Sequence, residues 1–240
     1  MKHLIWIIPS LCLTLTTCLN RAHRNVISGT QPSFFDAFDY PEGPLPENYW
    51  SEGAPAEIRD GHLYVNANLP DQQAATVWLR REWSGDLLIR FKAHVLASAK
   101  ERNNINFFLL YSDPLGTPLE DTRDQRSDGR YARYHDLNGY LFTYVQEPDS
   151  AEDAPARFRF RDVPGFDHLL AERYTYTGEG QTTRQIAIEK RGDRISYSVD
   201  DQLIFSVRDT MYNRPHTRGL IGFRTFGTEL WWDDLSVTDL

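Results

Sequence analysis

The sequence contains very little cysteine. Its 240 residues include only Cys12 and Cys18, which both lie close to the N-terminus. The rest of the chain therefore has neither a disulfide framework nor a cysteine-based zinc site. A basic excess is also missing, because 26 Lys and Arg stand against 34 Asp and Glu, a formal net charge of -8. Proteins that bind nucleic acid without sequence preference carry such an excess, so we expect no nucleic-acid partner.

Several common catalytic motifs are absent as well. The chain has no Gly-x-Ser-x-Gly elbow, no phosphate loop and no His-Glu-x-x-His. It also lacks the Glu-x-Asp-x-x-Glu array of retaining β-glucanases, the best local signature of a two-carboxylate glycosidase. We expect no cofactor. The adjacent Asp233 and Asp234 suggest a structural Ca²⁺, although that ion takes about 6 to 8 oxygen ligands.

Only one long apolar run is present, from Leu4 to Leu15. It is too short to span a bilayer and predicts a secretory signal peptide over residues 1–17. The sequence Leu15-Thr16-Thr17-Cys18 resembles a bacterial lipobox, which predicts that Cys18 is lipidated and that residues 18–32 form a tether. The alternative is ordinary cleavage nearby. We expect an exported lipoprotein in the periplasm or at the cell surface, anchored to a membrane by its lipid.

Residues 33–240 form a single predicted domain that is rich in strands. Hydrophobic residues make up 40% of the chain, enough for a core, and the dominant hydrophobic period is two. No segment predicts a helix longer than three turns. The predicted strands are 62–66, 76–83, 86–95, 104–112, 137–146, 156–161, 169–174, 184–190, 194–200, 203–207, 220–226 and 229–238. About a dozen antiparallel strands in one domain indicate an all-β sandwich or jelly roll.

Long polar connections interrupt this pattern. The longest, Ser112–His135, has few apolar residues. Connections of this length are usually functional or mobile. For its most charged part, Glu120–Gly129, a disordered insertion is an equal alternative.

The C-terminal third resembles a known fold. The runs Gly219–Phe226 and Leu230–Val237 look like the closing hairpin of concanavalin A-like (laminin-G-type) sandwiches, and Ile195–Val207 resembles the hairpin before it. The chain is also similar to the YesU-like family of domains of unknown function. That similarity is carried by Thr76–Leu79, Asn104–Phe107, Tyr134–Tyr140, Ala156–Arg161 and Pro164–Phe166. It implies a concanavalin A-like sandwich associated with pectin and uronate-polysaccharide degradation.

Three arginines alternate with two phenylalanines in one predicted strand. Arg157, Arg159 and Arg161 fall at spacing two, which places their guanidinium groups on one face of the strand. Neighbouring like charges repel, so we expect an anion opposite them. Arginine suits bidentate capture of carboxylate or sulfate. The alternative is a solvated strand face balanced by acidic side chains.

Further candidate site residues precede this strand. Tyr134, His135 and Tyr140 can move protons, while Asn104 and Asn106 share one strand face and can bind sugar hydroxyls or a uronate. Such a set suits β-elimination, in which a cation neutralises the carboxylate and a base removes the proton at C5. Alternatively, Tyr134, His135 and Tyr140 form a partly solvated aromatic cluster that packs the loop. The two asparagines could equally satisfy backbone groups at the start of the strand.

These patterns predict a protein that acts on acidic oligosaccharide or polysaccharide. The first hypothesis is a carbon–oxygen lyase, either a polysaccharide lyase or an oligosaccharide dehydratase. The second is a non-catalytic protein that captures surface glycans on the same fold. The third is a glycoside hydrolase whose carboxylates lie on loops. We expect the lyase to bring His135, a tyrosine and the arginines into one enclosed cleft, and the binding protein to lack such convergence.

The lipobox resemblance generates a first testable prediction. Cys18→Ala removes the thiol that would carry the lipid, so the protein should move into the soluble fraction or stall in processing. Membrane partition, measured by cell fractionation and immunoblotting, is the check. A variant that stays in the membrane fraction, correctly processed, contradicts the lipoprotein prediction.

Overall fold

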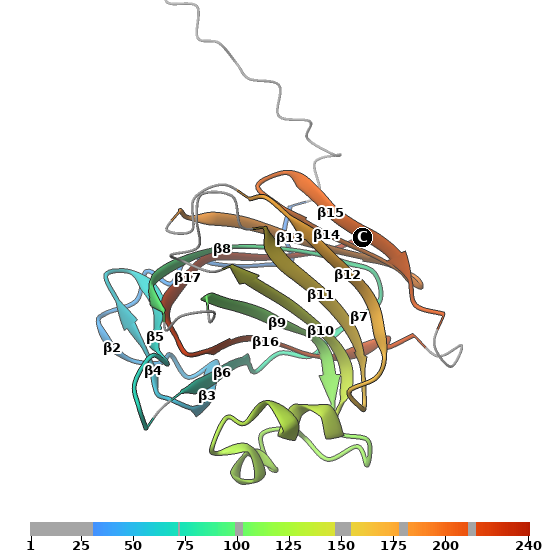
Figure 1. The fold of residues 1–240 in the computed structure, drawn as a ribbon. Coiled ribbons are helices and arrows are strands. Elements are labelled where there is room, and N and C mark those ends of the chain that lie inside the picture. Colours follow the sequence, from blue (N-terminus) through green and yellow to red (C-terminus); the bar gives the residue numbers. More distant parts are fainter. Residues whose placement is uncertain (1–30, 72, 99–102, 147–154, 178–181, 211–214) are drawn as a thin grey trace, which may run out of the picture. The chain divides into compact units, whose positions relative to one another are not determined.

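Two antiparallel sheets lie face to face in the computed structural model (Figure 1). All residues are described except 1–30, 72, 99–102, 147–154, 178–181 and 211–214. The first sheet, here sheet A, has the strand order β15-β14-β13-β8-β17-β5-β4-β2, with β1 beside β17. Its strands are β1 Phe34–Asp36, β2 Gly43–Pro44, β4 Ala56–Arg59, β5 His62–Asn66, β8 Leu87–Ser98, β13 Arg184–Arg191, β14 Arg194–Val199, β15 Gln202–Arg208 and β17 Thr228–Asp239.

The second sheet, sheet B, has the order β12-β11-β10-β9-β16-β6-β3, with β7 beside β16. Its strands are β3 Tyr49–Gly53, β6 Ala74–Leu79, β7 Trp83–Ser84, β9 Asn103–Ser112, β10 Asn138–Gln146, β11 Ala156–Val163, β12 Leu169–Thr175 and β16 Arg218–Phe226. One face of sheet B packs on sheet A and its other face carries the candidate site. The described part of the chain holds two short helices, η1 Arg123–Arg126 and η2 Tyr131–Asp136, both 3₁₀.

The predicted fold class is confirmed, because the described chain is a sandwich of antiparallel strands. The predicted hairpin at 195–207 is the β14–β15 pair. Four short strands, β1 to β4, were missed: β1, β2 and β4 have only two to four residues, and β3 begins with two adjacent aromatics instead of an alternation. The predicted strand 76–83 is wrong in its extent: β6 ends at Leu79 and β7 begins at Trp83.

Alternating side chains build the core between the sheets. On β11, Phe158 and Phe160 are fully buried, while the intervening arginines face outward. On β17, Trp232 lies in the core, whereas Trp231 stacks on the ring of His94 and contacts that of His62 on the outer face of sheet A. This arrangement follows from the two-residue period of a strand, which sends neighbours to opposite faces.

Residues 113–137, here called the covering loop, close over part of the outer face of sheet B. In Figure 1 the loop lies on the side of sheet B away from sheet A, and it carries η1 and η2. Its apolar side chains Leu119, Tyr134 and Leu137 form a second buried cluster with Trp78 and Phe108 of the sheet. The disordered insertion considered for residues 120–129 is therefore wrong: this segment folds against the sheet.

The carboxylate of Glu52 attaches the covering loop to the sheet. Glu52 lies on β3 with 1% of its side chain exposed, and it forms an ion pair of 3.0 Å with Arg126 of η1, whose side chain is 3% exposed. The same carboxylate accepts hydrogen bonds from Tyr134 Oη at 2.9 Å and from Trp78 Nε1 at 3.1 Å. Removing one partner of a buried pair leaves an uncompensated charge, so these contacts define where the loop sits.

Two glycines allow the loop backbone to approach the sheet this closely. Gly53 and Gly129 both have positive φ, at 84° and 63°. A Cβ on Gly53 would lie 2.2 Å from the carbonyl oxygen of Ala74, and one on Gly129 would lie 2.9 Å from the same oxygen. Only glycine tolerates both the conformation and the contact.

Several sequence predictions are not tested by the described structure. The signal peptide, Cys18 and nearly all of the tether at 18–32 lie outside the described residues. Asp233 and Asp234 both face Lys92, which forms ion pairs with them, and the structural Ca²⁺ stays a prediction. No described helix is long and apolar enough to cross a membrane.

The core position of Phe107 predicts a large loss of stability on truncation. Phe107 is 1% exposed and packs against Phe91 and Phe223. Phe107→Ala should lower the free energy of unfolding by about 3 to 5 kcal/mol, measured by urea denaturation. Leu115→Ala is the matched control, because Leu115 is 91% exposed, and its change should stay within about 0.5 kcal/mol. Equal effects of the two variants would contradict the assigned core.

The Glu52 contacts predict a second stability effect. Glu52→Ala leaves the Arg126 guanidinium buried without its partner, which should cost about 3 to 5 kcal/mol in free energy of unfolding. A double-mutant cycle with Arg126→Ala separates the pair from its surroundings, and it should give a coupling of at least about 1 kcal/mol. Additive effects of the two substitutions would show that Glu52 does not hold the loop through Arg126.

Candidate functional site

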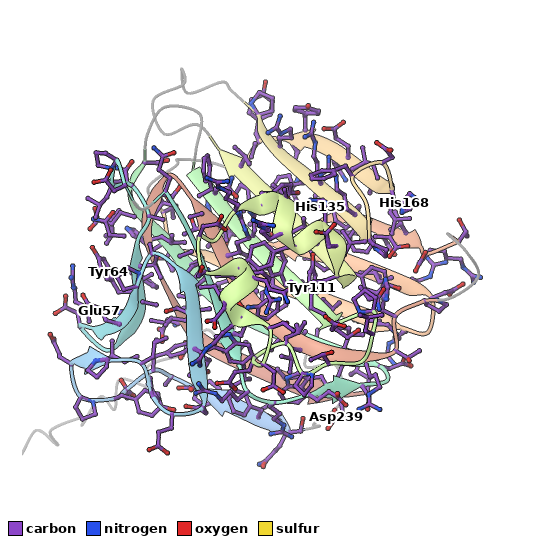
Figure 2. All side chains as sticks on the ribbon, turned by 90° about the horizontal axis from the view of Figure 1, so that it is seen from below. Glu57, Tyr64, Tyr111, His135, His168 and Asp239 are labelled. Atoms are coloured by element: carbon purple, nitrogen blue, oxygen red, sulfur yellow. The ribbon has the colours of Figure 1, made fainter. Side chains whose placement is uncertain are left out.

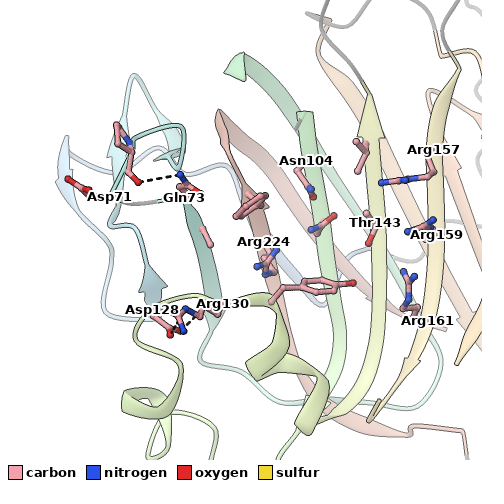
Figure 3. Close-up of a pocket in the computed structure, with 16 residues that line it drawn as sticks. Asp71, Gln73, Asn104, Asp128, Arg130, Thr143, Arg157, Arg159, Arg161 and Arg224 are labelled. Carbon is pink, nitrogen blue, oxygen red and sulfur yellow. Dashed lines mark hydrogen bonds and ion pairs between the residues drawn. The ribbon is translucent and has the colours of Figure 1, made fainter. Parts of the chain in front are cut away.

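The outer face of sheet B carries a pocket of about 700 Å³ beside the covering loop (Figure 3). Strands β6, β16, β9, β10 and β11 form its floor, and the covering loop forms one wall. Five arginines line the pocket, against the two carboxylates of Asp71 and Asp128. The pocket therefore concentrates positive charge in a protein whose net charge is -8.

Strand register explains why polar groups meet at this pocket. Paired residues form one row across all seven strands of the sheet B path, from β3 at one edge to β12 at the other. The row reads Glu52, Thr76, Arg224, Asn106, Thr143, Arg159 and Glu172. The adjacent row is mostly apolar, with Trp78, Gly222, Phe108 and Leu141 in register. The apolar row lies beneath the covering loop, and the polar row forms part of the pocket floor.

The three arginines of β11 take the arrangement that the sequence predicts. Arg157, Arg159 and Arg161 are half-buried, face away from the core and all line the pocket. Arg159 forms an ion pair of 2.6 Å with Glu172 of the neighbouring strand. Within the described residues, neither Arg157 nor Arg161 forms an ion pair. The alternative prediction, in which acidic side chains balance the arginines, is thus observed for Arg159 alone among the three.

A fourth arginine, Arg224 on β16, lies at the centre of the pocket in Figure 3. It is 1% exposed, and burial lowers the pKa of its guanidinium below the ordinary value. Its Nη2 donates a 3.1 Å hydrogen bond to the carbonyl of Gly129, and its guanidinium lies over the rings of Tyr131 and Tyr134 at 5.0 and 5.5 Å. No carboxylate among the described residues forms an ion pair with it. A buried charge without a counterion is costly, which marks the place where a bound anion would lower the energy.

Further polar atoms on the pocket floor are buried without a hydrogen-bond partner. They come from both predicted asparagines, from β10 and from two of the arginines: Asn104 Oδ1, Asn106 Oδ1, Thr143 Oγ1, Arg157 Nε and Arg224 Nε. Such atoms are rare in folded proteins, and each calls for an explanation. Five of them line one pocket, which makes this part of sheet B the candidate ligand site.

The opposite wall contains the remaining charged groups. Asp71, Asp128 and Arg130 lie on the side of the pocket away from the β11 arginines (Figure 3). Arg130 pairs with Asp128 at 3.2 Å. Tyr131, the first residue of η2, also lines the pocket, and its ring meets the edge of the His135 ring at 4.5 Å. Within the described lining, Tyr131 is the one phenol.

The predicted proton-transfer residues do not converge on the pocket. His135 is 2% exposed; its Nδ1 donates to the carbonyl of Gly165 at 2.5 Å and its ring stacks on Phe166. Burial lowers the pKa of His135, so the ring is neutral at neutral pH. Figure 2 places His135 at the covering loop. The expected cleft that joins His135, a tyrosine and the arginines is not formed.

Tyr134 and Tyr140 are buried in two different places. Tyr134 donates to Glu52 beneath the covering loop. Tyr140 points between the sheets, where its hydroxyl donates to Asp209 at 2.6 Å and accepts from the backbone of His216. Burial raises the pKa of both phenols, so neither gives up its proton readily. Neither side chain lines the pocket.

Sequence reasoning missed Arg224 and Tyr131. A signal for Arg224 was present, since it stands opposite Ile221 and Phe223 in the two-residue period of β16. Tyr131 belongs to the same aromatic and basic stretch as the predicted residues. Both tyrosines pack on the same buried cluster, since residues three apart in a 3₁₀ helix lie on one side, but only Tyr131 also lines the pocket.

Solved structures share this fold. A protein of unknown function with a galectin-like fold from Bacillus subtilis superposes with a TM-score of 0.72 at 17% identity, covering 87% of this chain and 96% of that one. The carbohydrate-binding module CBM66 from Bacillus subtilis gives 0.55 at 13% identity, covering 83% and 100%. A β-1,3-1,4-glucanase (lichenase) derived from a mouse hindgut metagenome gives 0.54 at 13% identity, covering 86% and 98%. These identities show the fold alone.

The sequence itself matches one family model, and no curated protein matches it. The match covers residues 69–235, more than half of the chain, and it includes the β11 arginines, both asparagines, Tyr131 and Arg224. Membership of the YesU-like family and association with pectin stay predictions. The chain belongs to the family described as domain of unknown function DUF6250, on a galectin-like, concanavalin A-like sandwich.

Proposed function

We propose that the arginine-lined pocket binds an acidic saccharide whose anionic group is the carboxylate of a uronic acid. One observation carries the proposal: the pocket holds five arginines together with five buried polar atoms that have no partner. An anion would compensate Arg157, Arg161 and Arg224, and sugar hydroxyls would satisfy Asn104, Asn106 and Thr143. A volume of about 700 Å³ suits a small ligand.

Charge distribution supports an acidic ligand over a neutral one. The chain carries a formal charge of -8, so its overall field repels anions. The pocket lining has five arginines against two carboxylates, and guanidinium groups bind carboxylates in a bidentate geometry. The similar structures include a carbohydrate-binding module and a lichenase, which are both named for a saccharide ligand or substrate. Our proposal extends saccharide binding to this chain.

Binding is the function that the geometry supports best. Elimination by His135, Tyr134 or Tyr140 has no support, because none of these side chains lines the pocket. The glycosidase alternative depends on Asp71 and Asp128, the two carboxylates of the described lining. Asp128 already forms an ion pair with Arg130, and both aspartates lie on the wall away from the β11 arginines.

The proposal predicts a specific loss of affinity in Arg157→Ala. Charged hydrogen bonds contribute about 1.5 to 3 kcal/mol, so the dissociation constant for a glucuronate oligosaccharide should rise about 10- to 150-fold, measured by titration calorimetry. Arg191→Ala is the matched control: Arg191 lies on sheet A, is half exposed and pairs with Glu189. Its dissociation constant should equal that of the wild type.

A second ligand provides the chemical control. The same oligosaccharide with its carboxylates reduced to alcohols keeps the sugar backbone and loses the charge, so it should bind weakly to the wild type and no more weakly to Arg157→Ala. Equal affinity of the wild type for the two ligands would contradict an acidic-saccharide site. Unchanged uronate affinity in both Arg157→Ala and Arg161→Ala would do the same.

A further inference from the structure

The pocket contains one side chain that is suited to proton transfer on a bound sugar, and it is Tyr131. Its other described titratable groups are the five arginines, which stay protonated, and the two aspartates on the wall away from the β11 arginines (Figure 3). The hydroxyl of Tyr131 makes no hydrogen bond to any described residue, in contrast to those of Tyr134 and Tyr140. It is therefore available to a ligand.

Neighbouring residues hold the Tyr131 ring beside a cation. The edge contact with His135 at 4.5 Å and the contact with Phe166 at 6.3 Å support the ring from the loop side. The guanidinium of Arg224 lies 5.0 Å from the ring centroid. A fixed positive charge stabilises the negative charge that the phenolate oxygen carries before it takes the proton and regains when it returns it. Arg224 also pairs in register with Asn106, so a guanidinium and an amide are neighbours on the pocket floor.

We propose that Tyr131 is the catalytic residue of a β-elimination in this pocket and that it acts as both base and acid from one face of the sugar ring. The proposal rests on the proposed binding of a uronate. The phenolate oxygen removes the proton from C5, the electron pair forms the C4=C5 double bond, and the C4–O bond breaks. The phenol then returns the proton to the departing oxygen. Atoms and electrons balance, and Tyr131 ends as it began.

The use of a single group restricts the stereochemistry of the substrate. A residue on one face of the ring reaches both atoms only when the C5–H and C4–O bonds project from that same face. Glucuronate and mannuronate have this arrangement, whereas galacturonate, guluronate and iduronate project the two bonds from opposite faces. The arginines bind the carboxylate and the amides bind hydroxyl groups, and neither contact depends on the relative configuration at C4 and C5. Uronates of both stereochemical classes can therefore bind. Under this proposal glucuronate- and mannuronate-type chains are substrates, and uronates of the opposite class are unreactive ligands.

The experiment combines turnover and binding on one set of ligands. The full-length protein is incubated with glucuronate, mannuronate, galacturonate and guluronate oligosaccharides, and the ultraviolet absorbance of the C4=C5 double bond is followed. Product should form from the first two and not from the last two. Tyr131→Phe should lower the rate about 10²- to 10⁴-fold with an unchanged dissociation constant. Tyr176→Phe, a control at a tyrosine that is 61% exposed and outside the pocket lining, should keep the wild-type rate.

The outcomes separate this proposal from the one on which it rests. If uronates bind through Arg157 but none yields product, the catalytic role of Tyr131 is wrong and the binding function stands. Product from Tyr131→Phe at the wild-type rate, or equal product from galacturonate, also overturns the proposal. If no uronate binds, both proposals fail. Thermal unfolding of Tyr131→Phe at the wild-type temperature confirms that a lost rate is not a lost fold.

Discussion

The buried carboxylate of Glu52 is the contact on which the rest of the site depends. Within a few ångströms it accepts hydrogen bonds from the indole of Trp78, the phenol of Tyr134 and the guanidinium of Arg126. These donors come from sheet B and from both short helices of the covering loop. An unpaired carboxylate at this depth would be too costly to keep, so the loop has one low-energy position on the sheet. That position brings Tyr131 and the carbonyl of Gly129 to Arg224.

The strand register of sheet B determines which polar side chains lie beside Glu52 and form the pocket floor. The polar row that begins at Glu52 continues through Arg224, Asn106 and Thr143 to Arg159, so charge compensation is complete at both edges of the sheet and incomplete in the middle. At one edge Glu52 has Arg126, and at the other Arg159 has Glu172. The central guanidinium of Arg224 has aromatic rings and a carbonyl instead. This uncompensated cation at the floor of the pocket is the feature on which the proposed binding of an anion rests.

The sequence pattern predicted side-chain directions that depend on a single strand. The spacing of Arg157, Arg159 and Arg161 was enough to place three guanidinium groups on one face, because a strand has a fixed period of two. The same period places Tyr140 between the sheets, in phase with Phe142 and Tyr144 of β10, which argues against its predicted role in proton transfer. Arg224 and Glu52 meet the other groups through pairing between strands far apart in the chain, and no local pattern contains that register.

The central claim is that an anionic sugar compensates the arginines of this pocket. A crystal structure of the Tyr131→Phe variant with a glucuronate trisaccharide tests it most directly, because the variant should hold the sugar without consuming it. The account predicts a carboxylate oxygen about 2.7 to 2.9 Å from a guanidinium nitrogen of Arg224 or of a β11 arginine, and sugar hydroxyls on Asn104, Asn106 or Thr143. A trisaccharide bound elsewhere, for example against Trp231 on sheet A, with the arginine pocket free of sugar, would contradict it.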